Sequence, residues 1–145
     1  MIEGWPLPYT DDPQDKPFWE ATRRGELVVQ ACSSCARLRF PPRPMCPWCQ
    51  SVAYEWRALS GKGRIWSFAV SHPPLLPVFA ERAPYPVIVV EVDEDPTIRM
   101  VGNLVAEASS DINEIDPATI NIGDRVSVVF SELADDVVLP RWVLV

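Results

Sequence analysis

Four cysteines, the only ones in the chain, form two C-x-x-C pairs separated by ten residues: Cys32 with Cys35, and Cys46 with Cys49. Each pair can present two thiolates from one tight turn, so the two turns together can complete a tetrahedron around one metal ion. Four protein sulfurs leave no coordination position for water, which predicts a structural site and not a hydrolytic one. We expect one zinc ion per chain, with iron as the alternative metal and a disulfide as the alternative chemistry.

The rest of the composition offers little catalytic chemistry. The chain of 145 residues has one histidine, His72, and no glycine-rich run that could hold a phosphate group. Its content of 48% hydrophobic and 23% charged residues is typical of an ordinary globular protein. Its 16 prolines are spread along the chain, which disfavours long helices and favours short strands. We therefore predict a structural or docking protein that is not an enzyme by itself.

Charge and hydropathy narrow the expected location and partners. No apolar run approaches the ~20 residues that a membrane span needs, and the opening residues MIEGWP lack the basic and apolar regions of a secretory signal. We expect a cytoplasmic protein without a membrane partner, since cysteines stay reduced there and remain free for metal. The net charge is −7, with the acidic side chains concentrated in the second half. That half should repel a phosphate backbone, so no nucleic-acid partner is expected.

A short helix is predicted before the first cysteine pair. Asp12 or Asp15 can cap its start, and Gly25 can end it. Phe18 and Trp19 are neighbours on this helix, so one of their rings can face away from the helix's buried side. Both rings can instead pack on the chain's own ribbon or barrel.

Alternating apolar residues predict strands over most of the remaining chain. Segments 27–31 and 54–59 can close a ribbon around the metal, and the turn 60–63 follows. Five more strands are expected, over 66–70, 87–92, 98–104, 126–130 and 139–145. In the first of them, Trp66 and Phe68 take the core-facing positions. Gly102 in mid-strand favours a small closed barrel of the oligonucleotide/oligosaccharide-binding (OB) type, and the polar segment 109–122 should hold one helical turn at most.

The residues around the cysteines resemble a known family. The segments CSSC (32–35) and FPPRPMCPWC (40–49) are similar to the rubredoxin-like zinc ribbon of the family catalogued as domain of unknown function 35 (DUF35). The resemblance covers nearly the whole chain and continues through GKGRIWSF (61–68), APYP (83–86), VVEVDE (89–94) and IGDRV (122–126). The family often has glycine after the second cysteine of each pair, whereas this chain has Ala36 and Gln50, so each turn is either strained or differently shaped.

This resemblance implies a mainly β protein in three parts. An N-terminal arm with a short helix occupies residues 1–26, a rubredoxin-like zinc ribbon 27–59, and a five-stranded OB-fold barrel 60–145. It also implies a non-catalytic scaffold subunit bound to a thiolase-fold enzyme, such as a lipid-transfer-protein-like thiolase or an aldolase. Such enzymes make or cleave carbon–carbon bonds in acyl-CoA thioesters, with retro-aldol cleavage of steroid side-chain CoA thioesters as one example.

Two sets of residues are candidate contacts of this complex. The apolar, proline-stiffened loop after His72 and the aromatic pair of the helix can dock on the partner, or pack on this chain instead. The predicted docking residues are Phe18, Trp19, Leu75, Leu76, Val78 and Phe79. Arginines can contact the phosphates of CoA, or stay solvated, or face an acidic patch of the partner. These arginines are Arg37, Arg39, Arg43 and Arg82.

Two other functions compete with the scaffold role. A zinc ribbon joined to an OB barrel can bind single-stranded nucleic acid, with Trp66 and Phe68 as stacking platforms, although the acidic charge opposes this. The same four thiolates with iron would make a rubredoxin-like electron carrier. Salt-dependent binding to an oligonucleotide would identify a nucleic-acid-binding protein, and metal analysis would identify an electron carrier.

Overall fold

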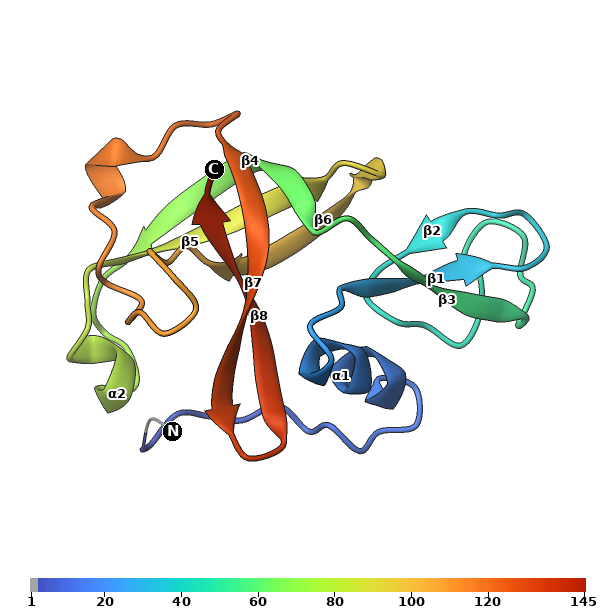
Figure 1. Ribbon diagram of the computed structural model, residues 1–145, viewed down its shortest axis with the longest axis horizontal. Coiled ribbons are helices and arrows are strands. Elements are labelled where there is room, and N and C mark those ends of the chain that lie inside the picture. Colours follow the sequence, from blue (N-terminus) through green and yellow to red (C-terminus); the bar gives the residue numbers. More distant parts are fainter. Residues whose placement is uncertain (1–2) are drawn as a thin grey trace.

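The computed structural model describes residues 3–145, so the first two residues of the predicted arm lie outside the described part. Two antiparallel sheets make up the molecule: a three-stranded sheet of order β2-β1-β3 and a five-stranded sheet of order β6-β5-β4-β7-β8. The small sheet and the large sheet lie at opposite ends of the long axis, and helix α1 lies between them (Figure 1). The fold is thus mainly β, as predicted.

The elements have the following bounds. The N-terminal helix and the ribbon comprise α1 (Lys16–Arg23), β1 (Val28–Cys32), β2 (Leu38–Arg39) and β3 (Tyr54–Ala58). The larger sheet and its connections comprise β4 (Lys62–Ser71), α2 (Pro77–Ala80), β5 (Tyr85–Val92), β6 (Asp95–Asn103), η1 (Pro117–Thr119), β7 (Arg125–Ala134) and β8 (Val137–Leu144).

Helix α1 begins and ends close to where the sequence predicted. Asp15 stands at the N-cap, but its side chain makes no capping hydrogen bond. The amide of Lys16 donates instead to the carbonyl of Asp12 at 2.7 Å. Gly25 follows the helix with φ of 75°, a left-handed conformation that glycine adopts without steric cost. The apolar face is buried, with Phe18 at 7% exposure.

The five-stranded sheet curls into a half-barrel, consistent with the predicted OB fold. A parallel bridge between Leu104 and Trp142 brings the end of β6 next to β8. Gly102 is the residue that allows this approach, because a Cβ atom there would lie 2.8 Å from a carbon of the Trp142 ring. The mid-strand glycine therefore makes room for one buried indole, which is 1% exposed.

One hydrophobic cluster joins the helix, the ribbon and the half-barrel. Ile88 and Val90 of β5 are fully buried, and they belong to the same cluster as Leu27 and Val29 at the start of the ribbon. Phe18 of α1 lies in it as well. The two sheets are therefore packed on a common core, and each supplies apolar surface to the other.

Strand β4 departs from the predicted alternation. Its pairing with β5 shifts between Ile65 and Ser67, which marks a β-bulge at Trp66. The bulge turns Ile65 into the core at 1% exposure and leaves Trp66 45% exposed. The prediction that Trp66 is a core residue was wrong for this reason, whereas Phe68 packs against the core as expected.

Two segments outside the sheets complete the description. The polar connection before β7 contains the single 3-10 turn η1, in agreement with the prediction of at most one turn. The predicted N-terminal arm lies against the larger sheet: the ring of Trp5 contacts that of Phe79 at a centroid distance of 5.1 Å. The guanidinium of the buried Arg141 lies 5.3 Å from the Trp5 ring. The short helix α2, which carries Phe79, was not predicted.

Candidate metal centre and docking surfaces

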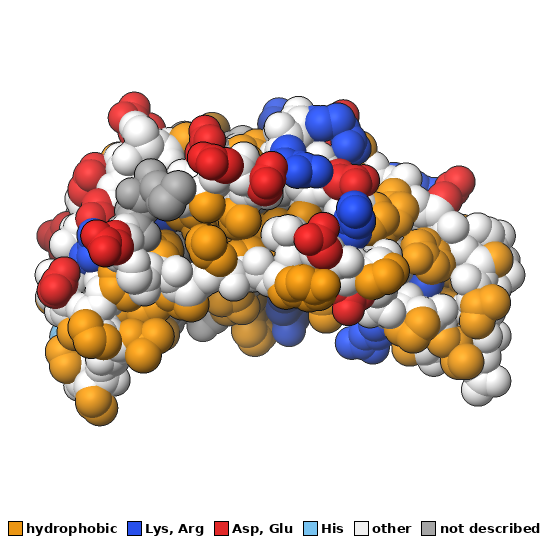
Figure 2. All heavy atoms as spheres, turned by 90° about the horizontal axis from the view of Figure 1, so that it is seen from below, with side chains coloured by type: hydrophobic (Ala, Val, Ile, Leu, Met, Phe, Trp, Pro, Cys, Tyr) orange, Lys and Arg blue, Asp and Glu red, His pale blue; other side chains and the backbone are white. Residues whose placement is uncertain are grey.

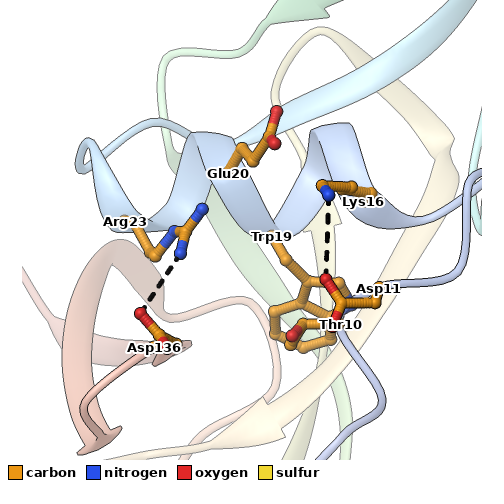
Figure 3. Close-up of a pocket in the computed structure, with 7 residues that line it drawn as sticks. All are labelled: Thr10, Asp11, Lys16, Trp19, Glu20, Arg23 and Asp136. Carbon is orange, nitrogen blue, oxygen red and sulfur yellow. Dashed lines mark hydrogen bonds and ion pairs between the residues drawn. The ribbon is translucent and has the colours of Figure 1, made fainter.

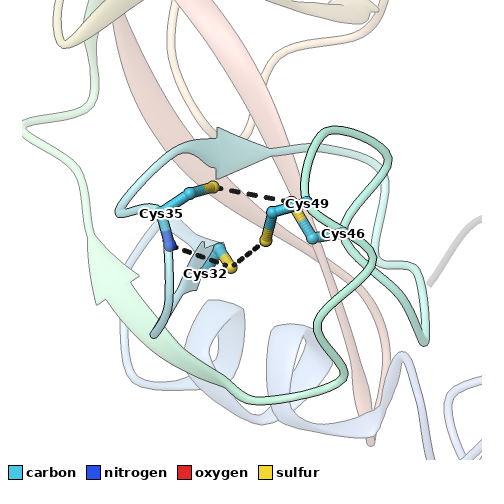
Figure 4. Close-up of side chains that lie close together, drawn as sticks. All are labelled: Cys32, Cys35, Cys46 and Cys49. Carbon is cyan, nitrogen blue, oxygen red and sulfur yellow. Dashed lines mark hydrogen bonds between the residues drawn. The ribbon is translucent and has the colours of Figure 1, made fainter.

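The structure brings the four predicted metal ligands together. One sulfur atom from each of Cys32, Cys35, Cys46 and Cys49 lies within 4.8 Å of all the others. The Sγ atoms of Cys32 and Cys49 are 3.5 Å apart, and those of Cys35 and Cys46 are 3.7 Å apart. Figure 4 shows the four side chains converging from the two loops. Tetrahedral sulfur is the ligand set of structural zinc, and also of iron.

The two cysteine loops repeat the same backbone turn. The amide of Ala36 donates to the carbonyl of Cys32 at 3.0 Å, and that of Gln50 to the carbonyl of Cys46 at 2.9 Å. Ala36 and Gln50 have φ of 64° and 63°. Both loops thus keep the left-handed conformation that glycine favours, although neither residue is glycine. A side chain in this conformation costs roughly 1–2 kcal/mol.

Backbone amides around the sulfurs favour the charged thiolates. The Cys35 amide, 3.5 Å from the Cys32 sulfur, is the main cause that lowers the pKa of Cys32 to about 6. Burial raises the pKa of Cys46, but hydrogen bonds from the amides of Cys49 and Trp48 and with the thiols of Cys35 and Cys49 together outweigh it, so the net shift is downward. The Ser51 amide lowers the pKa of Cys49, yet hydrogen bonds with neighbouring thiols and burial raise it to about 11. Without a metal, repulsion between neighbouring thiolates opposes deprotonation of all four cysteines at once. A bound cation would offset that repulsion.

The ribbon arginines have unequal environments. Arg39 is 2% exposed, and its Nε donates to Oε1 of Gln30 at 2.9 Å while its Nη2 donates to the carbonyl of Arg43 at 3.0 Å. Arg37 is exposed and lies over the Trp48 ring, with 5.3 Å from its Cζ to the ring centroid. The buried Gln30 was missed by sequence reasoning, although a polar residue inside the apolar run LVVQA was an available signal.

A cleft separates the ribbon from the half-barrel. It has a volume of about 320 Å³ and is lined by Arg39, Phe40, Arg43 and Trp48 of the ribbon and by Thr97 of β6. The fourth predicted arginine, Arg82, lies elsewhere. Its Nε donates to both carboxylate oxygens of Asp111 at 2.9 Å, and its Nη1 to the carbonyl of Val78 at 2.7 Å. Arg82 is therefore already neutralised within the chain.

The aromatic pair of α1 is mostly turned inward. Phe18 is buried and packs on Phe40 at a centroid distance of 5.6 Å, so its ring is not offered to another protein. Trp19 is half-buried, packs against the core and forms one wall of a small pocket of about 130 Å³. Figure 3 shows this pocket, with the ion pair between Arg23 and Asp136 at 3.5 Å on one side. Of the two rings, only that of Trp19 is partly exposed.

The proline-rich loop before and through α2 projects from the molecule. Leu76 is 57% exposed, while Leu75, Val78 and Phe79 are half-buried. Figure 2 shows hydrophobic side chains gathered on the lobe at the left, where α2 and this loop project. Phe79 turns back toward the arm and Trp5, so the loop is partly packed on its own chain and partly open.

A second apolar surface was missed by sequence reasoning. On the outer face of β4, β5 and β6, Trp66 is 45% exposed and Val101 is 70% exposed. Val101 pairs with Val89 across the sheet, and the guanidinium of Arg99 lies 3.8 Å from the Trp66 ring centroid. No sequence signal marks this surface, because the bulge that turns Trp66 outward depends on the pairing with β5.

Comparisons with known proteins agree with this architecture. Residues 19–55 match the family described as ChsH2, rubredoxin-like zinc ribbon domain, and residues 56–131 match ChsH2, C-terminal OB-fold domain. A DUF35 domain-containing scaffold protein of Methanothermobacter thermautotrophicus is 35% identical over 79% of this chain and 78% of its own length. The chain belongs to the DUF35 family. This confirms the family that the cysteine segments resembled.

Other similar proteins differ in length. A probable enoyl-CoA hydratase alpha subunit of Thermomonospora curvata is 37% identical over 88% of this DUF35 chain, which spans only 36% of that relative. A solved chain described as an Ltp2-ChsH2(DUF35) aldolase is 32% identical, with a TM-score of 0.79, covering 94% of this chain and 98% of the other. A DUF35 protein of unknown function from Sulfolobus solfataricus, 11% identical with a TM-score of 0.61, shares the fold.

The hydropathy of the helices adds one further finding. Within residues 3–145, neither α1 nor α2 has the length and apolar character required to cross a lipid bilayer.

Proposed function

We propose that this DUF35 chain is a non-catalytic scaffold subunit of a thiolase-fold enzyme that makes or cleaves carbon–carbon bonds in acyl-CoA thioesters. The observation that carries the proposal is the likeness, over almost the full length of both chains, to the chain described as an Ltp2-ChsH2(DUF35) aldolase. The relatives named scaffold proteins support the same role. Side-chain CoA thioesters of steroids are the proposed substrate class, since a Mycobacterium tuberculosis relative is named for 3-oxo-4,17-pregnadiene-20-carboxyl-CoA.

The proposal assigns the chemistry of the reaction to the partner. Carbon–carbon bond cleavage next to a thioester needs a nucleophile or a base tuned near neutral pH. All four thiols of this chain lie in one cluster, and they are better suited to a metal than to attack on a substrate. His72 is exposed and directly follows the last residue of β4. In this proposal, His72 has no catalytic role.

The metal centre is proposed to hold one structural zinc ion. The four sulfurs and the two matching turns fit zinc, which would supply the bonds that fasten one cysteine loop to the other. The chain's own amides hold the sulfurs in position and favour their charged form. Metal analysis of the purified protein tests this: about one zinc and no iron per chain is expected, whereas stoichiometric iron with strong visible absorption would identify an electron carrier.

Docking is proposed to use the loop around Leu76 and the outer sheet face around Trp66. Both present exposed apolar side chains next to ones that are half-buried, as interfaces commonly do. Arg99 covers the Trp66 ring, so Trp66 is better suited to an arginine–aromatic contact at a protein interface than to stacking a base.

A co-purification experiment tests the scaffold role. The chain is co-expressed with each candidate thiolase-fold enzyme of its source organism in turn, and any complex is sized by gel filtration with light scattering. We expect a stable hetero-oligomer, and thioester cleavage only when both proteins are present. Leu76→Asp should weaken the complex, while Val52→Asp, at a ribbon residue that is 68% exposed, should not. Turnover by the isolated chain, or failure to bind any thiolase-fold enzyme, would refute the proposal.

A further inference from the structure

Strand β3 leaves one edge of the ribbon sheet without a strand beside it. Within residues 3–145 the sheet has the order β2-β1-β3, so β3 is paired on one side only, and Figure 1 shows it on the far side of β1 from β2. Proteins commonly block such an edge with proline, a bulge or a covering segment. The strand YEWRA (54–58) has no proline, its register with β1 is unbroken, and Glu55, Arg57 and Ala58 are exposed. The edge is therefore available to a further strand.

The backbone groups on this free edge follow from the pairing with β1. The amide of Leu59, directly after β3, donates to the carbonyl of Leu27 at 2.8 Å. Residues that bond to the neighbouring strand alternate with residues that do not along an antiparallel pair. The odd-numbered residues of β3 therefore direct their N–H and C=O groups toward β1. The even-numbered residues, Tyr54, Trp56 and Ala58, direct theirs toward the free edge.

Two copies of this strand are complementary in one antiparallel register. Because only the even-numbered residues can exchange hydrogen bonds across two free edges, Trp56 can face Trp56 of the second copy. This register places Glu55 directly opposite Arg57 of the second copy, and the twofold symmetry repeats the pair. The two registers next to it place Glu55 opposite Glu55 or Arg57 opposite Arg57, and like charges in that position are destabilising. The charges thus select a single twofold arrangement.

The side chains of β3 are already placed for this pairing. Glu55 and Arg57 have side chains that are 70% and 49% exposed, with 3.8 Å between Oε1 and Nη2. Such an exposed pair within one strand is weak, so it can be exchanged for pairs across the two copies at little cost. Trp56 is half-buried and packs edge-on against Tyr54 at a centroid distance of 6.0 Å. Aromatic side chains opposite each other on one face add to strand pairing.

We propose that two copies of the chain pair through β3 in this antiparallel register, which joins their two ribbon sheets into one. The contact involves one short strand from each copy, so the dimer is expected to be weak and to be strengthened where a larger complex already holds two copies together. The partner in this inference is the same chain, and its surface lies on the ribbon. It is therefore separate from the loop around Leu76 and the sheet face around Trp66 that are proposed for the thiolase-fold enzyme.

Sedimentation velocity of the zinc-loaded full-length chain tests the pairing, from micromolar to millimolar concentration. We expect a monomer–dimer equilibrium with a dissociation constant below about 1 mM. Glu55→Arg alone, or Arg57→Glu alone, puts like charges opposite each other twice, so each should weaken the dimer about tenfold or more. An equimolar mixture of these two variants should restore dimerisation, because opposite charges then face each other again. The double variant should restore it for the same reason.

Two further variants separate the charges from the backbone. Glu132→Arg makes the same change of charge at an exposed residue of β7, and at moderate salt it should change the dissociation constant less than about twofold. Ala58→Pro removes an N–H that faces the free edge, at a strand edge where proline is tolerated. It should weaken the dimer about tenfold while the amide spectrum of the monomer stays dispersed.

Three outcomes would overturn the proposal. The first is a chain that stays monomeric up to millimolar concentration. The second is an effect of Glu132→Arg as large as that of Glu55→Arg, or a folded double variant that fails to dimerise. The third is an Arg57→Glu variant that loses binding to a thiolase-fold enzyme while the wild-type chain is monomeric, which would assign this edge to that enzyme. If the dimer is absent and the thiolase-fold complex still forms, the scaffold function is unaffected.

Discussion

Ala36 and Gln50 occupy the strained position of the two cysteine turns, with φ of 64° and 63°. Replacing Ala36 by glycine should relieve roughly 1–2 kcal/mol of left-handed strain, of which about 0.5–1 kcal/mol is lost again to the entropy of the unfolded chain. We therefore expect Ala36→Gly to raise the free energy of unfolding by about 0.5–1 kcal/mol in urea titrations of the zinc-loaded protein. Ala53→Gly, at an exposed ribbon residue without positive φ, should lower it. A loss of stability in Ala36→Gly would contradict the strain argument.

Gly102 is a second residue whose small size matters, because it leaves room for the buried indole of Trp142. A methyl group at this residue would lie 2.8 Å from the ring, too close for an ordinary carbon contact. We expect Gly102→Ala to lower the free energy of unfolding by about 1–3 kcal/mol, the usual cost of overpacking. Val101→Ala, on the exposed face of the same strand, should cost much less. Near-ultraviolet circular dichroism should show the tryptophan signal change only in the Gly102 variant.

At the scale of elements, one ion pair ties the β5–β6 hairpin to β7. The guanidinium of Arg125 donates to both carboxylate oxygens of Asp93 at 2.6 Å, and this contact is the main cause that lowers the pKa of Asp93. Because the folded pKa is below the unfolded value of about 3.9, the pair adds stability above that pH, and the gain is lost as acid protonates the carboxylate. Both side chains are partly exposed, so solvent screens the pair and keeps the gain small.

Asp93→Asn should therefore lower stability near neutral pH and make it less dependent on pH below about pH 4. Urea titrations at several pH values measure this difference. Glu55→Gln, which removes a longer and exposed pair with Arg57 at 3.8 Å, is the control and should change the free energy of unfolding less than Asp93→Asn does. An Asp93→Asn variant whose stability curve stays parallel to the wild-type curve through the acid range would refute the role of this pair.

Some features of the strands could be predicted from the sequence, and others could not. The apolar pattern over 87–92 predicted the strand β5, because alternation is a local property of the sequence, and the structure buries Ile88 and Val90 of that strand fully. The spacing of the cysteines predicted their convergence for an equally local reason. The orientation of Trp66 could not be predicted, since it depends on a one-residue shift against a neighbouring strand. The burial of Arg39 likewise depends on Gln30 from another strand, and periodicity alone does not reveal such a pairing.

At the scale of the whole molecule, the common core predicts that metal loss affects more than the ribbon. Leu27 and Val29 of the ribbon lie in the same cluster as Ile88 of the half-barrel. Removing the proposed zinc ion should cost on the order of 10–16 kcal/mol of apparent folding energy in the ribbon, and it should also uncover apolar surface on the barrel. We expect a chelator, or replacement of all four cysteines by serine, to broaden the amide signals of both sheets in magnetic resonance spectra.

The contrary outcome is a half-barrel that keeps its dispersed spectrum and its melting temperature after the metal is removed. That result would mean that the contacts of Leu27 and Val29 add little to the larger sheet. Addition of zinc to the chelated protein is the control, because it should restore the original spectrum if the ribbon refolds.

The path of the arm decides where extra protein can be attached to this chain. A Cβ atom on Gly4 would lie 3.8 Å from Val78, and Trp5 contacts Phe79, so Gly4 and Trp5 lie next to the apolar lobe of α2. The last residue, Val145, lies near the beginning of β7, where its amide donates to the carbonyl of Arg125. Figure 1 shows this end of the chain well away from α2. A fusion or label at the amino end would crowd that lobe, whereas one at the carboxyl end would leave it accessible.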